Sequence, residues 1–237
     1  MIDQLMRAAW PALEEVPVDG WLARFSGGVT QRANSVLPLA APVDLDRALT
    51  RVEALYADRG LPAIFQLGPD SEPGTLDRVL AERGYETGSP TSIQTAKIDG
   101  VTRPAGVAVA EAPDQDWLDL WWAVDGRGDA DALSLAVKIL TGGPALYATI
   151  NDEYGAAAVG RLALVGEWGG VYCMAVRADV RRRGLGAAVL AGLHAAGRER
   201  GVTRTWLHVL AENAAAQQLY ARHGYAQVST YHYRTQR

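Results

Sequence analysis

The sequence predicts an α/β fold built from two related halves. Strand and helix signals alternate along all 237 residues, which favours mixed sheets covered by helices. A continuous apolar run, a glycine-bearing turn and a long helical pattern follow one another over residues 171–200. The two halves end in similar segments, 76–97 and 216–234. The composition, 49% hydrophobic and 21% charged, is typical of a globular chain that buries a sizeable core.

Charge and cysteine content exclude several classes of protein. A net charge of −4 argues against a general nucleic-acid binder. The single cysteine excludes an intrachain disulfide, and the four histidines lack the short paired spacing of a metal helix, so no metal is expected. No run of about 18 apolar residues predicts a membrane span, and the N-terminal residues carry acids rather than a signal sequence. We therefore expect a cytoplasmic protein with neither membrane nor nucleic acid as partner.

The first half predicts three helices and four strands. The helices are expected near 3–15, 44–59 and 75–83. The strands are expected at 20–26, 34–39, 62–68 and 92–98. Turn residues dominate 99–106, so a boundary is placed there between a first domain, 1–100, and a second domain, 107–237.

The second half predicts a longer alternation of the two elements. Strands are expected at 107–111, 145–150, 157–166, 171–176, 204–210 and 227–234. Helices are expected near 114–124, 129–141, 184–200 and 214–222. The strand at 171–176 is apolar throughout, as suits a strand buried on both faces, and 204–210 supplies its parallel neighbour. The segment 171–210 is therefore predicted to form a β-α-β crossover.

Both halves share one order of elements near their ends. A helix, an Arg/His-Gly-Tyr stop and a strand follow in that order, and upstream of each a helix ends in Arg-Gly, at 59–60 and 200–201. The spacing is too long for a solenoid repeat and indicates two related domains. The first half has no arginine-glycine junction before its helix at 44–59, so it is predicted to hold no phosphate group.

The junction in the second half predicts an anion site. Arg181, Arg182 and Arg183 precede Gly184-Leu185-Gly186 at the start of a helix. Glycines let an anion approach the backbone, whose first N–H groups have no helical acceptor, and guanidinium groups match phosphate oxygens. A pyrophosphate fits these donors. A solvated surface loop is one alternative; a dinucleotide site is another, although the third glycine position is Val189 and no acid ends the next strand.

Two motifs together resemble the GNAT superfamily of acetyl-CoA-dependent N-acetyltransferases. Residues 181–186 fit its Arg/Gln-x-x-Gly-x-Gly/Ala signature, and "ENAAAQQLYARHGY" at 212–225 resembles its second landmark. The resemblance covers 107–237 and implies a GNAT fold there, with a mixed central sheet flanked by helices in a catalytic domain. The first hundred residues resemble the degenerate GNAT-like half of tandem members.

The resemblance also implies which residues bind the acyl donor, acetyl-CoA. Backbone groups of one strand would hold its pantetheine arm, and the following turn and helix start would hold its pyrophosphate. The implied strand residues are Met174, Ala175 and Val176. The implied pyrophosphate residues are Arg181, Arg182, Arg183, Gly184, Leu185, Gly186 and Ala187.

Tyr220 and Glu167 are the candidate catalytic residues. Tyr220 matches the family's tyrosine near the CoA sulfur and would supply a proton to the leaving thiolate; a plain core role is the alternative. Asn213 lies on the same helix face, seven residues earlier, either as a cofactor contact or as a helix N-cap. Glu167 would deprotonate the amine. Asp152, Glu153, His208 or a chain of waters could replace it.

The expected activity is transfer of an acetyl group to a primary amine of a small molecule, in a ternary complex. An amino acid, an amino-acid-like natural product or an antibiotic would serve as acceptor, and arginine and asparagine in 24–36 could suit a carboxylate. Cys173 is expected to be a structural thiol rather than a nucleophile. Alternatives are acetylation of a protein lysine or N-terminus, and a non-catalytic acyl-CoA-binding module. A monomer or homodimer is expected.

Overall fold

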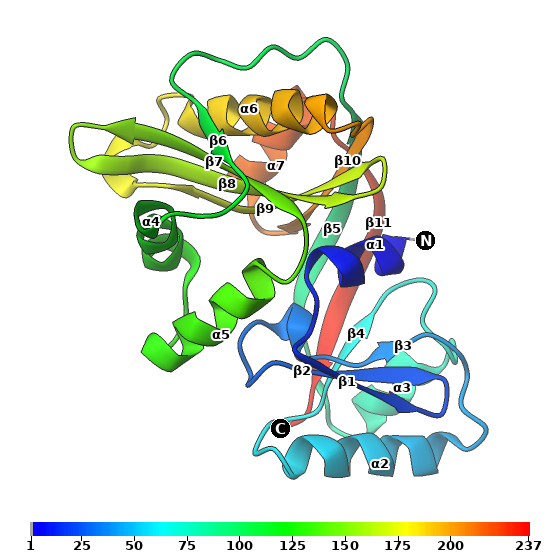
Figure 1. Cartoon of the computed structure of the whole chain (residues 1–237). Helices are drawn as coiled ribbons and strands as arrows, with labels where there is room; N and C mark the ends of the chain where they lie inside the picture. The colour runs from blue at the N-terminus through cyan, green and yellow to red at the C-terminus, as the bar shows by residue number, and fades with distance from the viewer. Residues whose placement is uncertain (1) are drawn as a thin grey trace. The chain divides into compact units, whose positions relative to one another are not determined.

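The computed structural model describes residues 2–237, apart from the side chain of Asp3, and confirms an α/β fold (Figure 1). The chain folds into two compact units. Unit 1 contains the N-terminal segment that ends at Pro11, then Gln94–His208 and Ala214–Ala226. Unit 2 contains Ala12–Ile93, Val209–Asn213 and Gln227–Arg237. The boundary expected at 99–106 lies inside unit 1, because the central segment of this unit begins at Gln94. Each unit also takes a terminal segment from the opposite end of the chain.

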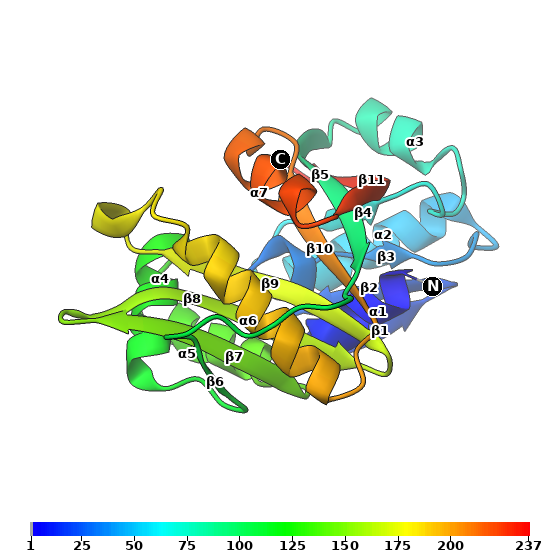
Figure 2. The same ribbon diagram turned by 90° about the horizontal axis from the view of Figure 1, so that it is seen from above.

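Unit 1 is a sheet with helices on both faces. Its helices are α1 (Ile2–Ala9), α4 (Gln115–Asp125), α5 (Ala130–Leu140), α6 (Leu185–Glu199) and α7 (Ala214–Arg222). Its strands are β6 (Ala108–Ala110), β7 (Ala145–Asp152), β8 (Gly155–Val165) and β9 (Trp168–Val176), with most of β10 (Arg204–Leu210) and the end of β5 (Glu86–Lys97). Strands β6 to β9 pair antiparallel, and β10 pairs parallel to β9. Helix α6 covers one face and α4 the other (Figures 1 and 2).

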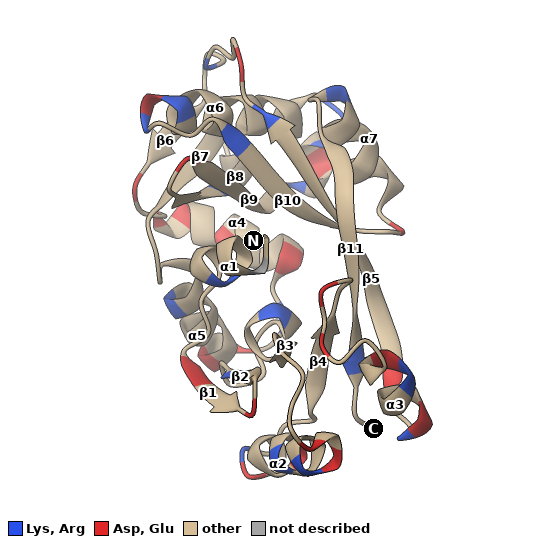
Figure 3. Ribbon diagram, turned by 90° about the vertical axis from the view of Figure 1, so that its right-hand side faces the viewer, with Lys and Arg blue, Asp and Glu red and all other residues tan. Residues whose placement is uncertain are grey.

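Unit 2 has a small sheet, two helices and a further strand pair. Strands β1 (Glu14–Val18), β2 (Trp21–Phe25) and β3 (Leu37–Pro38) form an antiparallel sheet. Helices α2 (Leu45–Ala57) and α3 (Leu76–Glu82) follow, and β4 (Ile64–Leu67) pairs antiparallel with β11 (Ala226–Thr235). Trp21, Leu49, Tyr56 and Phe65 lie in its hydrophobic core. Acidic and basic residues both occur on α2 (Figure 3).

The hydrogen-bonded strand order is β4-β11-β5-β10-β9-β8-β7-β6, with both parallel and antiparallel neighbours. The mixed sheet flanked by helices is therefore confirmed. Strand β10 and helix α7 have the predicted bounds to the residue. The helix expected over 3–15 is wrong beyond Ala9, because Pro11 has no N–H to continue it and residues 14–18 pair with β2 instead.

The repeated stop signal forms the same structure twice. Gly84 and Gly224 both have positive φ, 83° and 81°, which glycine adopts at low cost. The same two hydrogen bonds close each helix, Gly84 N–H to Ala81 and Tyr85 N–H to Leu80 in one, Gly224 N–H to Ala221 and Tyr225 N–H to Tyr220 in the other. The tyrosine after each glycine is buried. The similarity between the two sequence segments therefore extends to their backbone hydrogen bonds.

A buried hydrogen-bond chain fastens α6 to β10 in unit 1. His194 Nε2 lies 2.9 Å from the Tyr225 hydroxyl, which donates to Thr205 Oγ1 at 2.8 Å, and Thr205 donates to the Ala96 carbonyl at 3.5 Å. Because the Tyr225 proton is used toward Thr205, the His194 Nε2 position must carry a hydrogen and donate. Burial lowers the pKa of His194 to about 4, so the ring is neutral at pH 7.

The buried hydrogen bonds of His194 predict that the protein is less stable to unfolding in acid. Unfolded His194 takes a proton below its usual pKa of 6.5, whereas folded His194 does so only near its pKa of about 4. The free energy of unfolding should therefore fall as the pH drops from 6.5 to 4, by up to about 3 kcal/mol from this residue. Urea unfolding at several pH values measures it. The variant His194→Gln, which keeps a donor but does not titrate, should lose less stability over that window; an identical loss in both proteins contradicts the assignment.

Candidate functional site

Strands β9 and β10 separate part-way along their length. Their parallel pairing runs from Trp168 and Arg204 to Val171 and Leu207, and then ends. Strand β9 nevertheless continues to Val176, still paired with β8 on its other side. Residues 174–176 thus lie beyond the last pair with β10 and form an open edge of β9. An open strand edge of this kind can pair with an extended ligand.

A β-bulge lies in the same segment of β9. On β8, Gly160 alone faces both Cys173 and Met174, since Val159 pairs with Ala175 and Arg161 pairs with Tyr172. Cys173 has a φ of 54°, in the left-handed region that a side chain rarely adopts. A Cβ on Gly160 would lie 2.6 Å from Met174 Sδ and 2.7 Å from Val189 Cγ1, so the glycine lets α6 pack closely on the bulge. The bulge re-aims the peptide groups of the open edge.

The turn after β9 contains one arginine that forms ion pairs and three arginines that form none with the described residues. Arg177 pairs with Asp179 at 2.8 Å and also with Asp152, which raises the pKa of Arg177 and lowers the pKa of Asp152. In contrast, the exposed side chains of Arg181, Arg182 and Arg183 form no ion pair with any residue that the structure describes. Arg181 Nε donates to the Val176 carbonyl at 3.1 Å, at the end of the open edge. Arginine side chains that form no ion pair with the described residues therefore follow that edge directly.

Helix α6 begins without a side-chain cap. Gly184 is its N-cap, with a φ of 81°, and the first helical hydrogen bond runs from Ala188 N–H to the Gly184 carbonyl. The N–H groups of Leu185, Gly186 and Ala187 therefore have no acceptor within the helix. No acidic residue lies in the first turn. Free N–H groups, the positive helix end and three arginines give this turn the groups that attract an anion.

The equivalent helix of unit 2 begins differently. Asp44 caps α2, and its side chain accepts a hydrogen bond from Arg47 N–H at 3.0 Å, while Asp46 adds a second negative charge. A carboxylate already occupies the position that an anion would take. This contrast gives a physical reason for expecting the anion site in one half only.

Helix α7 contacts the start of α6 and carries Tyr220. A Cβ placed on Gly186 would lie 3.6 Å from Leu219 Cδ2 and 3.7 Å from Val176 Cγ2, so α7, the α6 turn and the end of β9 converge there. Tyr220 is buried, with its ring 5.7 Å from that of Tyr225, and burial raises the pKa of Tyr220 to about 12. The Tyr220 hydroxyl therefore stays protonated throughout the physiological pH range.

Asn213 immediately precedes α7 and is exposed, with its N–H donating to the Leu210 carbonyl at 3.0 Å. It falls in unit 2, whereas Tyr220 falls in unit 1. In the loop at 24–36, Asn34 Oδ1 accepts from the N–H groups of Ser26 and Gly28, and its amide donates to Val29 and Thr30. Asn34 therefore closes a turn rather than offering its amide to a ligand.

The structure does not bring Glu167 to the open edge. Glu167 precedes β9 at its paired end, where its carbonyl accepts from Thr203 N–H and its carboxylate accepts from the Thr203 hydroxyl at 3.0 Å. Eight residues of strand separate it from Ala175, which is roughly 25 Å at 3.3 Å per residue. These contacts give Glu167 a structural role in the turn before β9. Of its rivals, Asp152 pairs with Arg177, whereas the His208 ring lies 5.9 Å from that of Tyr172.

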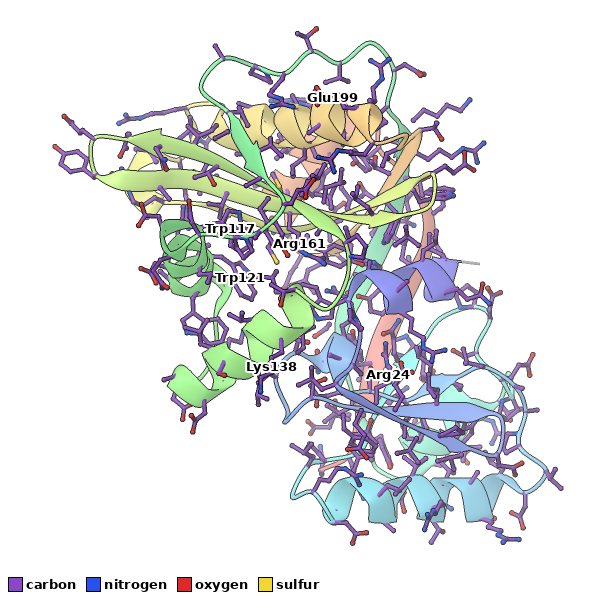
Figure 4. All side chains as sticks on the ribbon, in the orientation of Figure 1. Arg24, Trp117, Trp121, Lys138, Arg161 and Glu199 are labelled. Carbon is purple, nitrogen blue, oxygen red and sulfur yellow. The ribbon has the colours of Figure 1, made fainter. Side chains whose placement is uncertain are left out.

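Sequence reasoning missed a buried polar ladder beside the open edge. Tyr147, Arg161 and Tyr172 stand opposite one another on β7, β8 and β9. Arg161 has no exposed surface and lies on the sheet face that also carries Trp117 of α4 (Figure 4). One arginine within the apolar run 156–165 was the available signal, because a charged residue in a buried strand needs a reason.

Metal clusters and membrane helices are both absent from the described part of the chain. Among residues 2–237, no cluster of three or more His, Cys, Asp or Glu side chains is arranged to bind a metal. Within the same residues no helix has the length and apolarity required to cross a bilayer.

Comparison with known proteins gives consistent matches. A family model described as "Probable histone acetyltransferase Rv0428c C-terminal" matches residues 2–234. The "Uncharacterized N-acetyltransferase YobR" of Bacillus subtilis is 28% identical, covering 100% of this chain and 98% of that protein. A GCN5-related N-acetyltransferase from Kribbella flavida has a TM-score of 0.72 at 18% identity, covering 99% of this chain and 94% of the other. A tandem GNAT protein from the clavulanic acid biosynthesis pathway has a TM-score of 0.61 at 14% identity, covering 80% and 68%.

The two glycines of the α6 turn should respond differently to alanine. Gly184→Ala forces a side chain into a left-handed backbone and should lower the free energy of unfolding by about 1 kcal/mol. Gly186→Ala meets only ordinary van der Waals contacts in a helical turn and should leave stability unchanged or raise it by about 0.5 kcal/mol. Urea unfolding of both variants tests this, and equal losses would show that Gly184 does not hold the left-handed conformation.

Proposed function

Because this chain belongs to the family of the probable histone acetyltransferase Rv0428c C-terminal region and is a GNAT N-acetyltransferase, we propose that it transfers the acetyl group of acetyl-CoA to a primary amine of a small molecule. The observation that carries the proposal is the continuity of two features, an open β9 edge that leads directly into an uncapped helix start with unpaired arginines. An extended amide-bearing arm ending in a pyrophosphate is complementary to that order of groups.

The donor set of the turn fits acetyl-CoA. Backbone groups of Met174, Ala175 and Val176 would hold the pantetheine arm as an added strand would. The free N–H groups of 185–187, together with Arg181 to Arg183 and Gly184, would hold the pyrophosphate by charge-assisted hydrogen bonds. The carboxylates at the start of the equivalent α2 helix support one such site per chain. Asn213 is proposed as the N-cap of α7.

The chemistry requires an activated acyl group, an oxyanion donor and a proton source. Acetyl-CoA supplies a thioester, which a neutral amine attacks. We assign the oxyanion donor to a backbone N–H of residues 174–176, because the bulge fixes these peptide groups beyond the last pair with β10. We assign the proton that the leaving thiolate takes up to Tyr220 Oη, which burial keeps protonated. The proton that the amine nitrogen loses as the amide forms passes to water, and water returns a proton to Tyr220. Glu167 is given no part in this site. We propose direct transfer of the acetyl group in a ternary complex. Cys173 is assigned a structural role in the bulge and not a nucleophilic one.

Unit 2 is proposed as the degenerate GNAT-like half. It contains the capped helix α2 and the helix stop at Gly84 that parallels the stop at Gly224. Because its helix start carries carboxylates where unit 1 carries arginines, a role in holding CoA is not assigned to it. Activity should be measured on the full chain, because each unit is built from segments that are far apart in the sequence.

Charge at position 184 should control acetyl-CoA binding. Gly184→Asp places a carboxylate at the anion position and should raise the Kd for acetyl-CoA roughly 30-fold, about 2 kcal/mol. Gly184→Ala is the matched control, since it imposes the same backbone strain without charge and should change the Kd only a few-fold. Calorimetry measures both. An equal effect of the two substitutions would show that no anion binds at the turn.

Thiol release should depend on Tyr220. Acetyl-CoA with a panel of primary amines and amino acids should release CoA thiol, and Tyr220→Phe should lower kcat roughly 100-fold while the Kd for acetyl-CoA stays within about twofold. The pKa of about 12 means that Tyr220 itself causes no loss of rate up to about pH 10. A variant as fast as the wild type removes Tyr220 from catalysis. Thiol release only with histone peptides would move the acceptor from a small molecule to a protein lysine.

A further inference from the structure

Arg161 lies between two aromatic rings in the centre of the unit 1 sheet. The register places it directly opposite Tyr147 on one side and Tyr172 on the other, so all three side chains leave the same face. Its Cζ lies 5.7 Å from the Tyr172 ring centre, 6.0 Å from that of Tyr147 and 5.7 Å from that of Trp10. The guanidinium is therefore surrounded by aromatic faces, which stabilise a cation but accept few hydrogen bonds.

The hydrogen bonds of this buried cation are incomplete. Nη1 donates to the Ala9 carbonyl at 3.0 Å, and Nε reaches the Tyr147 hydroxyl only at 3.5 Å. Nη2 has no hydrogen-bond partner, and no carboxylate pairs with Arg161 among residues 2–237. Arg161 has 0% exposed surface, so bulk solvent does not reach it. A buried charge with an unmet donor is costly, and such groups are common where a ligand completes them.

A second unmet donor lies on the same face, next to the same tyrosine. Trp206 of β10 is fully buried, and its Nε1–H has no hydrogen-bond partner in the described chain. Its ring lies 6.5 Å from the Tyr172 ring, and both rings fill the space above Gly170, where a Cβ would lie 2.5 and 2.6 Å from them. Tyr172 is the first β9 residue beyond the last β9–β10 pair. Both residues therefore flank Tyr172, two residues before the open edge.

We infer that Arg161, together with Trp206 Nε1–H on the same sheet face, binds the carboxylate of the acceptor, so that the enzyme acetylates amino-acid-like amines. Arginine and tryptophan can only donate, so their common ligand must accept hydrogen bonds. A carboxylate carries one negative charge and two acceptor oxygens, which neutralises a single guanidinium, whereas a phosphate dianion would leave a buried negative charge. The inference rests on the proposed function, because it specifies the amine of the same reaction.

Arg24 shows what a purely structural buried arginine looks like in this chain. It is 1% exposed, yet Nε donates to the Ser35 carbonyl at 2.8 Å, and Nη2 donates to Ser35 Oγ at 2.7 Å and to Gln66 Oε1 at 3.1 Å (Figure 4). Among residues 2–237 neither arginine forms an ion pair with a carboxylate, but Arg24 is held by short bonds to neutral acceptors of its own unit. Arg24 therefore provides a matched control.

Helix α1 and the residue that follows it cover Arg161 on one side. Helix α1 has eight residues, too few for a stable isolated helix, and it leads into the Ala9 carbonyl and the Trp10 ring, stacked on Tyr172 at 5.4 Å. Because Arg161 is fully buried, a carboxylate reaches it only when this cover moves. Binding should therefore change hydrogen exchange in residues 2–11.

The test pairs amines that differ only in the carboxylate. Phenylalanine and phenethylamine, and lysine and cadaverine, are compared as acceptors by thiol release, and as ligands by calorimetry and by hydrogen exchange of residues 2–11. The wild type should prefer the amino acid by about 100-fold in kcat/KM, and Arg161→Met should reduce that preference to near unity. Arg24→Met should leave the preference unchanged. Trp206→Phe keeps the ring but removes the donor, and should reduce the preference about tenfold, so the inference stays testable if Arg161→Met fails to fold.

Each outcome decides one question. The carboxylate site is overturned if amino acids and the matching amines release thiol with equal kcat/KM, or if Arg161→Met leaves the preference unchanged. Either result leaves the acetyltransferase proposal intact. If no amine releases thiol, the proposed small-molecule activity fails, and calorimetry alone decides the inference. In that case, amino acid binding that is lost in Arg161→Met supports the site, and absent or equal binding overturns it.

Discussion

The site depends on one constraint, the mismatch in pairing around β9. Two residues of β9 oppose Gly160 of β8, and shortly before them along β9 the pairing with β10 stops. The glycine at position 160 admits the side chains of Met174 and Val189, so α6 packs directly over the bulge. Since α6 begins where the turn after β9 ends, this packing fixes its free N–H groups beside the open strand edge. Loss of the bulge would restore a regular ladder and move both features.

The starts of helices α2 and α6 differ in only a few groups. In α2 an aspartate accepts the hydrogen bond that an anion would accept, and the first turn is negative. In α6 a glycine in the left-handed conformation leaves the N–H groups free, and the residues before it are cationic. Both helices stop through glycines with the same hydrogen bonds, at Gly60 and Gly201. Similar backbones thus differ in the cap and in the charge at the helix start, which are the two properties that attract or exclude an anion.

Local patterns in the sequence predicted most elements and the turn, whereas features set by long-range pairing escaped. The bounds of β10 and α7 follow from apolar spacing and from glycine and asparagine signals. No local pattern reveals that Cys173 is left-handed or that β9 leaves β10 after Val171, because both depend on the register of neighbouring strands. Glu167 is adjacent in sequence to β9, but it lies at the end that pairs with β10. The open edge is at the other end of the strand.

The exchange of terminal segments has a consequence for the order of folding during synthesis. Strand β4 pairs with residues 232–235, and the Gln236 N–H donates to the Ala63 carbonyl. Most residues of unit 2 leave the ribosome first, yet its strand pair forms only after residues 227–237 have been made. The N-terminal helix likewise waits for β8 and β9 before it has a surface to cover. Unit 2 is incomplete until the C-terminal residues have been made, and the N-terminal helix has no partner until β8 and β9 have been made. The nascent chain therefore holds apolar strands without partners until synthesis reaches the last strand.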